Sequence, residues 1–150
     1  MATTTSTPIL PELSGLIGHL LRKSHLVAQR CFAEAFDGTD ISPVQYALLS
    51  VIGSNPDVSH KDLAKAVATA PSVVTTALKP LLEQDLLRQR RDPGDARSST
   101  YRLSSRGASF LNRMRGRIVF ASQRLEAPLT KAEADTLRKL LAKLIAASSP

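Results

Sequence analysis

Residues 59–84 read SHKDLAKAVATAPSVVTTALKPLLEQ, and this stretch decides the fold. Apolar residues recur at helical spacing in two segments, 61–68 and 71–84, which a short turn separates. Ser59 and Asp62 have the spacing of a capping box, in which the hydroxyl accepts a bond from one free backbone N–H and the carboxylate accepts from another. Two short helices with apolar facing sides, joined by such a turn, form a helix-turn-helix.

The helix predicted over 71–84 has two chemically different faces. Its apolar residues point inward, whereas the opposite face has small hydroxyl side chains followed by a lysine. Small hydroxyls let a helix approach the DNA major groove and reach base edges or phosphates, and a lysine can contact a guanine edge or the backbone. An ordinary solvent-facing surface would have the same residues, so this helix alone leaves both interpretations open. The inward residues are Val74, Leu78, Leu81 and Leu82; the candidate DNA contacts are Ser72, Val73 (suited to a thymine methyl group), Thr75, Thr76 and Lys79.

Pro80 lies inside this helix. A proline there removes the hydrogen bond to the carbonyl of Thr76 and clashes with that carbonyl, at a cost of about 3 kcal/mol in a regular helix. The sequence therefore predicts either a kink at Pro80 or a tilted second half of the helix.

A basic hairpin is predicted immediately after the helix-turn-helix. Segments 86–90 and 99–103 have strand character and flank a turn at 92–95. Between Leu86 and Arg106 there are six arginines and two aspartates, so this segment supplies +4 of the formal charge of +7. Narrow A·T-rich minor grooves attract arginine, although a solvent-facing hairpin with incidental arginines is the alternative. The candidate contacts are Arg88, Arg91, Asp95 and Arg97, and the Asp95 carboxylate is spaced to hold the Arg97 guanidinium through charge-assisted hydrogen bonds.

Helix-turn-helix followed by a basic hairpin indicates a winged helix, and long amphipathic helices are predicted on both sides of it. The fold class is mainly α with a small β-wing: a winged helix-turn-helix plus N- and C-terminal dimerisation helices. The terminal helices have more apolar surface than so small a lobe can cover, which favours a homodimer. The predicted parts are a disordered tail over 1–8, a dimerisation helix over 9–36, a DNA-binding lobe over 37–106 and C-terminal dimerisation helices over 107–147.

The composition favours a helical DNA-binding protein over other classes. Lys and Arg number 20 against 13 Asp and Glu, and a pI near 10.1 points to a polyanionic partner. The sequence has no apolar run of about 18 residues that would span a membrane and no signal-peptide layout, so we expect a cytoplasmic protein without membrane contact. With no phosphate-binding loop, no nucleophile motif and three scattered histidines, we expect no enzyme, no metal site and no cofactor.

From about Leu13 to Leu144 the chain resembles the MarR (multiple antibiotic resistance regulator) family of winged-helix transcription factors. The most specific motif is Asp95-x-Arg97 followed by Leu103-Ser104-x-x-Gly107, which is similar to the family's wing and the start of its fifth helix. Two positions depart from the family, because Thr76 stands where many relatives have arginine and Asp85 where they usually have glycine. Supporting motifs are Ser42-Pro43-x-Gln45-Tyr46-x-x-Leu49, Asp62-Leu63-Ala64, Val74-Thr75 and Leu129-Thr130-x-x-Glu133-x-x-x-Leu137-x-x-Leu140-Leu141.

The resemblance implies a sequence-specific transcriptional regulator. Arg97 would then enter the minor groove with Asp95 as its partner, while Ser72, Thr75 and Thr76 lie on the recognition helix. A two-fold homodimer would place two recognition helices about one turn apart on a pseudo-palindromic double-stranded DNA operator. The expected function is a repressor released by a small aromatic or carboxylated ligand. A nucleic-acid-binding protein without effector control is the alternative.

The resemblance also implies an effector site between the dimerisation helices and the DNA-binding lobe. Basic and imidazole side chains on the first two helices suit an anionic ligand, but surface charges and structurally satisfied histidines are the favoured alternative. The single cysteine, Cys31, excludes an internal disulfide and raises another alternative, a thiol-based redox-sensing regulator. It lies near the end of the first helix, whereas related peroxide sensors have their cysteine near its start. The candidate ligand-binding residues are His19, Arg22, His25, Arg30 and Tyr46.

Overall fold

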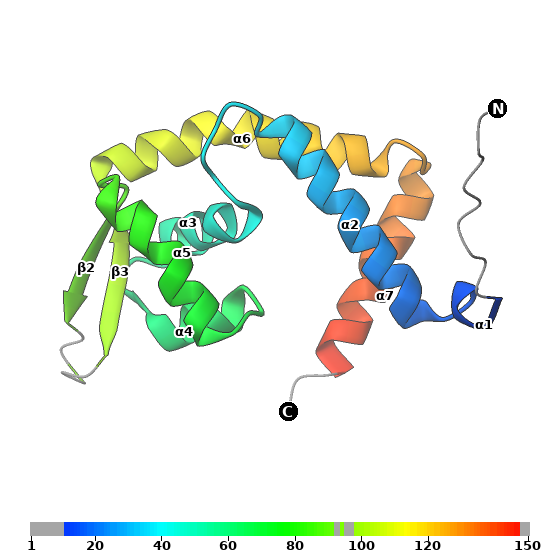
Figure 1. Ribbon diagram of the computed structural model, residues 1–150, viewed down its shortest axis with the longest axis horizontal. Coiled ribbons are helices and arrows are strands. Elements are labelled where there is room, and N and C mark those ends of the chain that lie inside the picture. The colour runs from blue at the N-terminus through cyan, green and yellow to red at the C-terminus, as the bar shows by residue number, and fades with distance from the viewer. Residues whose placement is uncertain (1–10, 92–93, 95–97, 148–150) are drawn as a thin grey trace, which may run out of the picture. The chain divides into compact units, whose positions relative to one another are not determined.

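The computed structural model describes residues 11–91, 94 and 98–147, which form seven helices and a three-stranded sheet (Figure 1). The chain divides into two compact units, residues 36–119 and residues 1–35 with 120–150. Among the described residues no helix combines the length and the apolar character needed to cross a membrane. The tail over 1–8, predicted to be disordered, lies outside the described residues, as do Asp95 and Arg97.

Three helices form the helix-turn-helix part of the 36–119 unit: α3 (Pro43–Ser54), α4 (His60–Ala66) and α5 (Pro71–Glu83). They pack together and α5 lies next to the wing (Figure 1). Their apolar sides form the core, and the predicted inward residues of α5 are buried except Leu82, which is half-buried. The best-buried side chains of this core are Leu48, Leu49, Ile52, Leu63, Val74, Leu78 and Leu81.

Two caps define where these helices begin. The Ser42 hydroxyl accepts from the Gln45 N–H, and Gln45 Oε1 accepts from the Ser42 N–H, which completes a capping box. At α4 the Ser59 hydroxyl accepts from the Asp62 N–H, as predicted. The Asp62 carboxylate differs from the prediction, because it accepts a 2.7 Å bond from the Ser59 hydroxyl and not one from a backbone N–H.

The wing is an antiparallel hairpin of β2 (Leu87–Arg91) and β3 (Ser99–Leu103), in which Leu87 faces Leu103 and Arg91 faces Ser99. A third strand, β1 (Val58–Ser59), pairs with the other edge of β3, so that β3 is central. The sequence analysis did not predict β1, because two residues are too few to show an alternating pattern.

The start of α6 (Ser105–Glu126) is joined tightly to the end of α5. Asp85 takes the left-handed conformation at φ +57°, which aspartate tolerates better than most residues. Its carbonyl accepts a 2.6 Å bond from the Ser104 hydroxyl, which in turn accepts a 2.9 Å bond from the Gly107 N–H and so caps α6. The Ser104 N–H donates to the carbonyl of Leu86 at 3.1 Å. These contacts explain the Leu103-Ser104-x-x-Gly107 motif.

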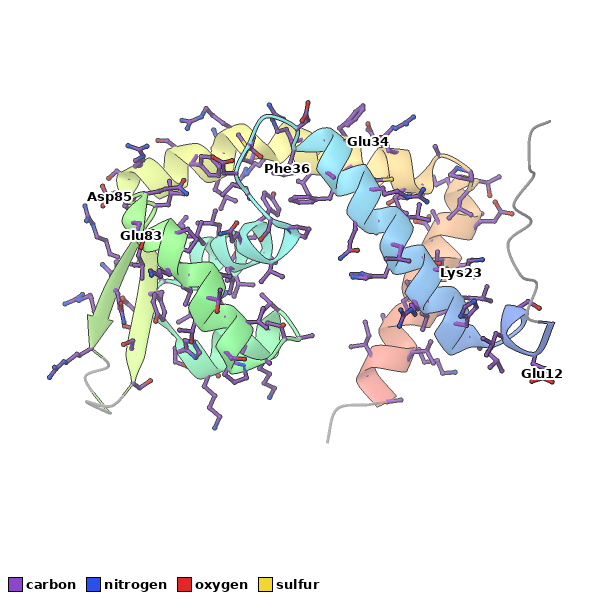
Figure 2. All side chains as sticks on the ribbon, in the orientation of Figure 1. Glu12, Lys23, Glu34, Phe36, Glu83 and Asp85 are labelled. Carbon is purple, nitrogen blue, oxygen red and sulfur yellow. The ribbon has the colours of Figure 1, made fainter. Side chains whose placement is uncertain are left out.

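The other unit, 1–35 with 120–150, contains α1 (Pro11–Ser14), α2 (Ile17–Ala35), the last residues of α6 and α7 (Lys131–Ala147). The single helix predicted at the N-terminus is interrupted at Gly15, where the high conformational entropy of glycine disfavours a helix interior. An ion pair of 3.3 Å joins Glu34 on α2 (Figure 2) to Arg124 on α6. The predicted capping box at the start of α7 is present: Thr130 and Glu133 exchange bonds between side chain and backbone.

Gly107 allows a close approach between the first turn of α6 and the chain before β2. A Cβ atom there would lie 1.9 Å from the carbonyl oxygen of Leu86, and that oxygen cannot move without moving the chain. Gly107→Ala is therefore expected to cost more than about 2 kcal/mol of unfolding free energy. Gly116→Ala, on the same helix and with open space around it, should be neutral or gain up to about 1 kcal/mol.

Urea unfolding followed by far-ultraviolet circular dichroism compares the two variants. Equal midpoints for Gly107→Ala and Gly116→Ala would contradict the assigned role of the close approach.

Candidate nucleic-acid interface

Five of the predicted DNA contacts belong to α5, and all five are exposed: Ser72, Val73, Thr75, Thr76 and Lys79. Lys79 lies 4.0 Å from Glu83, one helical turn further on (Figure 2). Both side chains of that pair are largely solvent-exposed, and such pairs are worth little. The lysine is therefore available to a polyanion.

A buried glutamine attaches α5 to α3. Gln45 is 8% exposed, and its Nε2 donates a 3.4 Å hydrogen bond to the carbonyl of Ala77 while its Oε1 is held by the α3 cap. The α5 helix continues through Pro80 to Glu83, so the proline does not end it. Because Pro80 has no N–H for the Thr76 carbonyl, the bond from Gln45 to the next carbonyl supports the helix at its weakest point.

His60 links α5 to the wing. Its Nε2 lies 3.0 Å from the Thr75 hydroxyl oxygen, and its ring is tilted at 52° to the ring of Tyr101 with 6.4 Å between centroids. Tyr101 belongs to the central strand β3 and is buried, which raises the pKa of its hydroxyl. This role of His60 could not be predicted from the sequence, because a contact across 15 residues leaves no local pattern.

Two of the wing arginines form ion pairs within the 36–119 unit, one local and one long-range. Arg88, one of the predicted contacts, lies 2.6 Å from the carboxylate of Asp85, at the junction of α5 and β2 (Figure 2). Arg102 binds Asp57 with both ends of its guanidinium, Nε donating to Oδ1 at 2.9 Å and Nη2 to Oδ2. The Arg102 hydrogen bond lowers the pKa of Asp57, and this pair attaches β3 to the turn before β1.

The main predicted arginine contact, Arg97, belongs to the outer part of the wing. Arg91, the last residue of β2, is exposed, and so is Arg90. Asp95 and Arg97, which follow at the turn, are outside the described residues, so their pairing remains a prediction.

The predicted ligand-binding residues are spread over both units. In the 1–35 and 120–150 unit, His25 lines an open pocket of about 530 Å³ together with residues of α6 and α7, including Glu126 and Arg138. Arg30 borders a separate hollow on α2. In the 36–119 unit, Tyr46 packs edge-on against Phe36 (Figure 2), with ring centroids 5.4 Å apart. Of the other two on α2, His19 is half-buried and Arg22 is exposed. Cys31, the residue of the redox-sensing alternative, is half-buried on the same helix.

Comparisons with known proteins agree with this architecture. A model of the MarR family matches residues 39–98, which include α3, α4, α5 and β2. A protein of Thauera aromatica, described as a transcriptional regulatory protein for the hcr operon, is 30% identical over 134 residues, covering 89% of this chain and 81% of that protein.

Solved structures are similar over most of their length. The PcaV transcriptional regulator from Streptomyces coelicolor, in complex with its natural ligand, is 26% identical with a TM-score of 0.81, covering 91% of this chain and 96% of that one. A mutant MarR from E. coli complexed with operator DNA is 22% identical with a TM-score of 0.81, covering 92% and 99%. At that identity the likeness concerns the fold, a winged helix with flanking helices.

The Asp57–Arg102 pair predicts a pH-dependent stability. Because the folded pKa of Asp57 is below its ordinary value of 3.8, the stabilisation is present above pH 3.8 and is lost as the pH falls through the folded value. Asp57→Asn should therefore be less stable than the parent at neutral pH and lose less stability on acidification. Denaturant unfolding at a series of pH values measures this dependence.

Asp40→Asn is the control, because its exposed carboxylate is in none of the ion pairs described for the chain. Parallel acid profiles for Asp57→Asn and the parent would argue against the role of the pair.

Proposed function

This chain is a member of the MarR family of transcriptional regulators, not an enzyme, and on that premise we propose that it is a sequence-specific repressor released by a small aromatic or carboxylated ligand. Its partner is a pseudo-palindromic double-stranded DNA operator, which it binds as a homodimer in the cytoplasm.

One observation supports DNA binding above the others. Within the 36–119 unit the exposed face of α5 and a basic hairpin belong to one packed body, joined through His60 and the short loop at Asp85. A helix for the major groove and an arginine-rich hairpin beside it are the two parts with which winged helix-turn-helix proteins contact a duplex. The recognition contacts in this proposal are Ser72, Val73, Thr75, Thr76 and Lys79 on α5 and Arg88, Arg91, Asp95 and Arg97 on the wing.

Exposed apolar side chains support the homodimer. The 1–35 and 120–150 unit leaves many large aliphatic residues exposed, among them Ile145 at 70% and Ile17 at 64%. So many exposed apolar side chains in one compact unit indicate an interaction site, and a two-fold homodimer is the commonest arrangement. The other members of the set in this unit are Leu16, Leu20, Leu21, Leu26, Val27, Leu125, Leu129, Leu137, Leu140 and Leu144.

A ligand-responsive regulator is favoured by the pocket beside His25. Its lining is mainly aliphatic, with Leu21, Leu129 and Leu137 beside the His25 imidazole. The Arg138 guanidinium and the Glu126 carboxylate also line it and are paired with each other at 2.6 Å, so His25 is the group left for an acidic ligand. Apolar walls with a few polar groups suit an aromatic ring with one acidic substituent. The solved PcaV, which is similar to this chain, holds its natural ligand.

A panel of phenols and aryl carboxylates tests the effector. A true ligand should raise the midpoint of thermal unfolding, because a compound that binds the native state stabilises it, and should weaken operator binding. His25→Ala should reduce the thermal shift, whereas Lys23→Ala, exposed on the same helix and outside the lining of this pocket, should leave it unchanged. A panel that alters neither quantity would favour a regulator without effector control.

Selection of bound duplexes from a random DNA pool tests the proposed function directly. We expect a pseudo-palindrome with half-sites about one helical turn apart and A·T pairs at its flanks. Arg97→Ala should bind the same site roughly 1–3 kcal/mol more weakly and lose the flanking A·T preference, while Lys79→Ala should weaken binding to most sequences and reduce its salt dependence. A pool recovered without any consensus would refute sequence-specific regulation.

A further inference from the structure

The threonine hydroxyls of α5 are already used within the protein. Thr75 donates to the carbonyl of Pro71 at 3.1 Å, and Thr76 donates to the carbonyl of Ser72 at 3.0 Å. The Thr75 oxygen is also 3.0 Å from His60 Nε2. Since a hydroxyl has one proton, neither side chain has a donor left for a base while these bonds hold.

What remains on this part of α5 is mainly hydrocarbon. Val73 is 42% exposed. Thr76, three residues further along α5 and on the same side of the helix, is also exposed. Both line a shallow hollow of about 550 Å³ between α5 and the start of α3, to which Ala77 and Pro80 also contribute. The surface of Val73 and Thr76 therefore offers methyl groups and acceptor lone pairs but no side-chain donor.

The major groove distinguishes bases by donors, acceptors and one methyl group. Guanine presents two acceptors and needs a donor such as arginine or lysine, whereas thymine presents its C5 methyl to apolar contact. We propose that the Val73 and Thr76 surface recognises thymine methyl groups, so that the operator half-site has T·A pairs where this surface lies. This inference rests on the proposed function. Lys79 and Ser72, at the two ends of the exposed face, supply the polar contacts.

This assignment differs from a hydroxyl-based recognition in what each atom of Thr76 does. If the methyl group makes the contact, the Thr76 oxygen bonds only to the Ser72 carbonyl of its own helix. Valine has the same shape as threonine and can then replace it without loss of DNA affinity. If the hydroxyl makes the contact, it either leaves the Ser72 carbonyl to donate to a base or stays there and accepts from a base amino group. In both cases loss of the oxygen is costly. The side-chain pair Thr76→Val and Thr76→Ser separates these two cases, because the first keeps both branches of the side chain and the second removes the methyl.

The experiment uses the highest-affinity duplex recovered from the selection. Deoxyuridine replaces each thymidine in turn, which removes the methyl group and leaves base pairing and the groove-edge hydrogen bonds intact. We expect about four-fold weaker binding per contacted methyl at one or two half-site positions, and no change at thymidines outside the α5 footprint. On the parent duplex Thr76→Val should bind like the parent protein and Thr76→Ser about four-fold more weakly.

A combined measurement then assigns the contact. Thr76→Ser should lose no further affinity on the deoxyuridine duplex, because both changes remove the same methyl–methyl contact. Deoxyuridine substitutions without effect, or Thr76→Val as weak as Thr76→Ser, would overturn the thymine assignment while leaving the regulator intact. A chain that selects no sequence at all would instead overturn the proposed function, and the thymine assignment with it.

Discussion

The contact between Gly107 and the Leu86 carbonyl sets the geometry of the 36–119 unit. It brings the first turn of α6 against the chain between α5 and β2, at a distance that no side chain would permit. The Ser104 hydroxyl, which serves both the Asp85 carbonyl and the Gly107 N–H, keeps this junction hydrogen-bonded in a buried place. The end of the recognition helix, the base of the wing and the origin of α6 are thereby joined at one point.

From this junction, three polar links orient the surface that would face DNA. Gln45 attaches α5 to α3, His60 attaches α5 to the central strand, and Asp57 attaches that strand to β1 through Arg102. Gln45 is buried, so its displacement would leave polar atoms without bonds, whereas the His60 and Arg102 links are exposed and act mainly by fixing how neighbouring elements are oriented. The helix and the wing are therefore presented as one preorganised surface, which reduces the entropy lost on binding a duplex.

The chemistry of that surface is divided between its parts. In the proposed interface, Lys79 and the wing arginines supply charge that attracts a polyanion, a contribution that depends on salt, and Arg97 adds the preference for A·T pairs at the flanks. The centre of α5 is different, because its hydroxyl protons are used internally and its exposed groups are largely methyl. The proposal thus assigns thymine recognition to α5 and the flanking preference to the wing.

The sequence by itself determined whatever depends on neighbours within about one helical turn: the helix-turn-helix, its caps, the hairpin, the inward and outward faces of α5, and membership of the family through the Leu103-Ser104-x-x-Gly107 motif. It did not predict β1, the break at Gly15, or the partners of Gln45, His60 and Arg102, which lie 32, 15 and 45 residues away in the chain. Such pairs leave no periodicity, because their partners become neighbours only when the helices and strands pack. Within one helical turn the sequence left one point open: each threonine hydroxyl of α5 can bond to the carbonyl four residues back or face outward, and only the structure shows that both turn back. The pairs across the fold had to wait for the tertiary structure, because packing alone makes their partners neighbours.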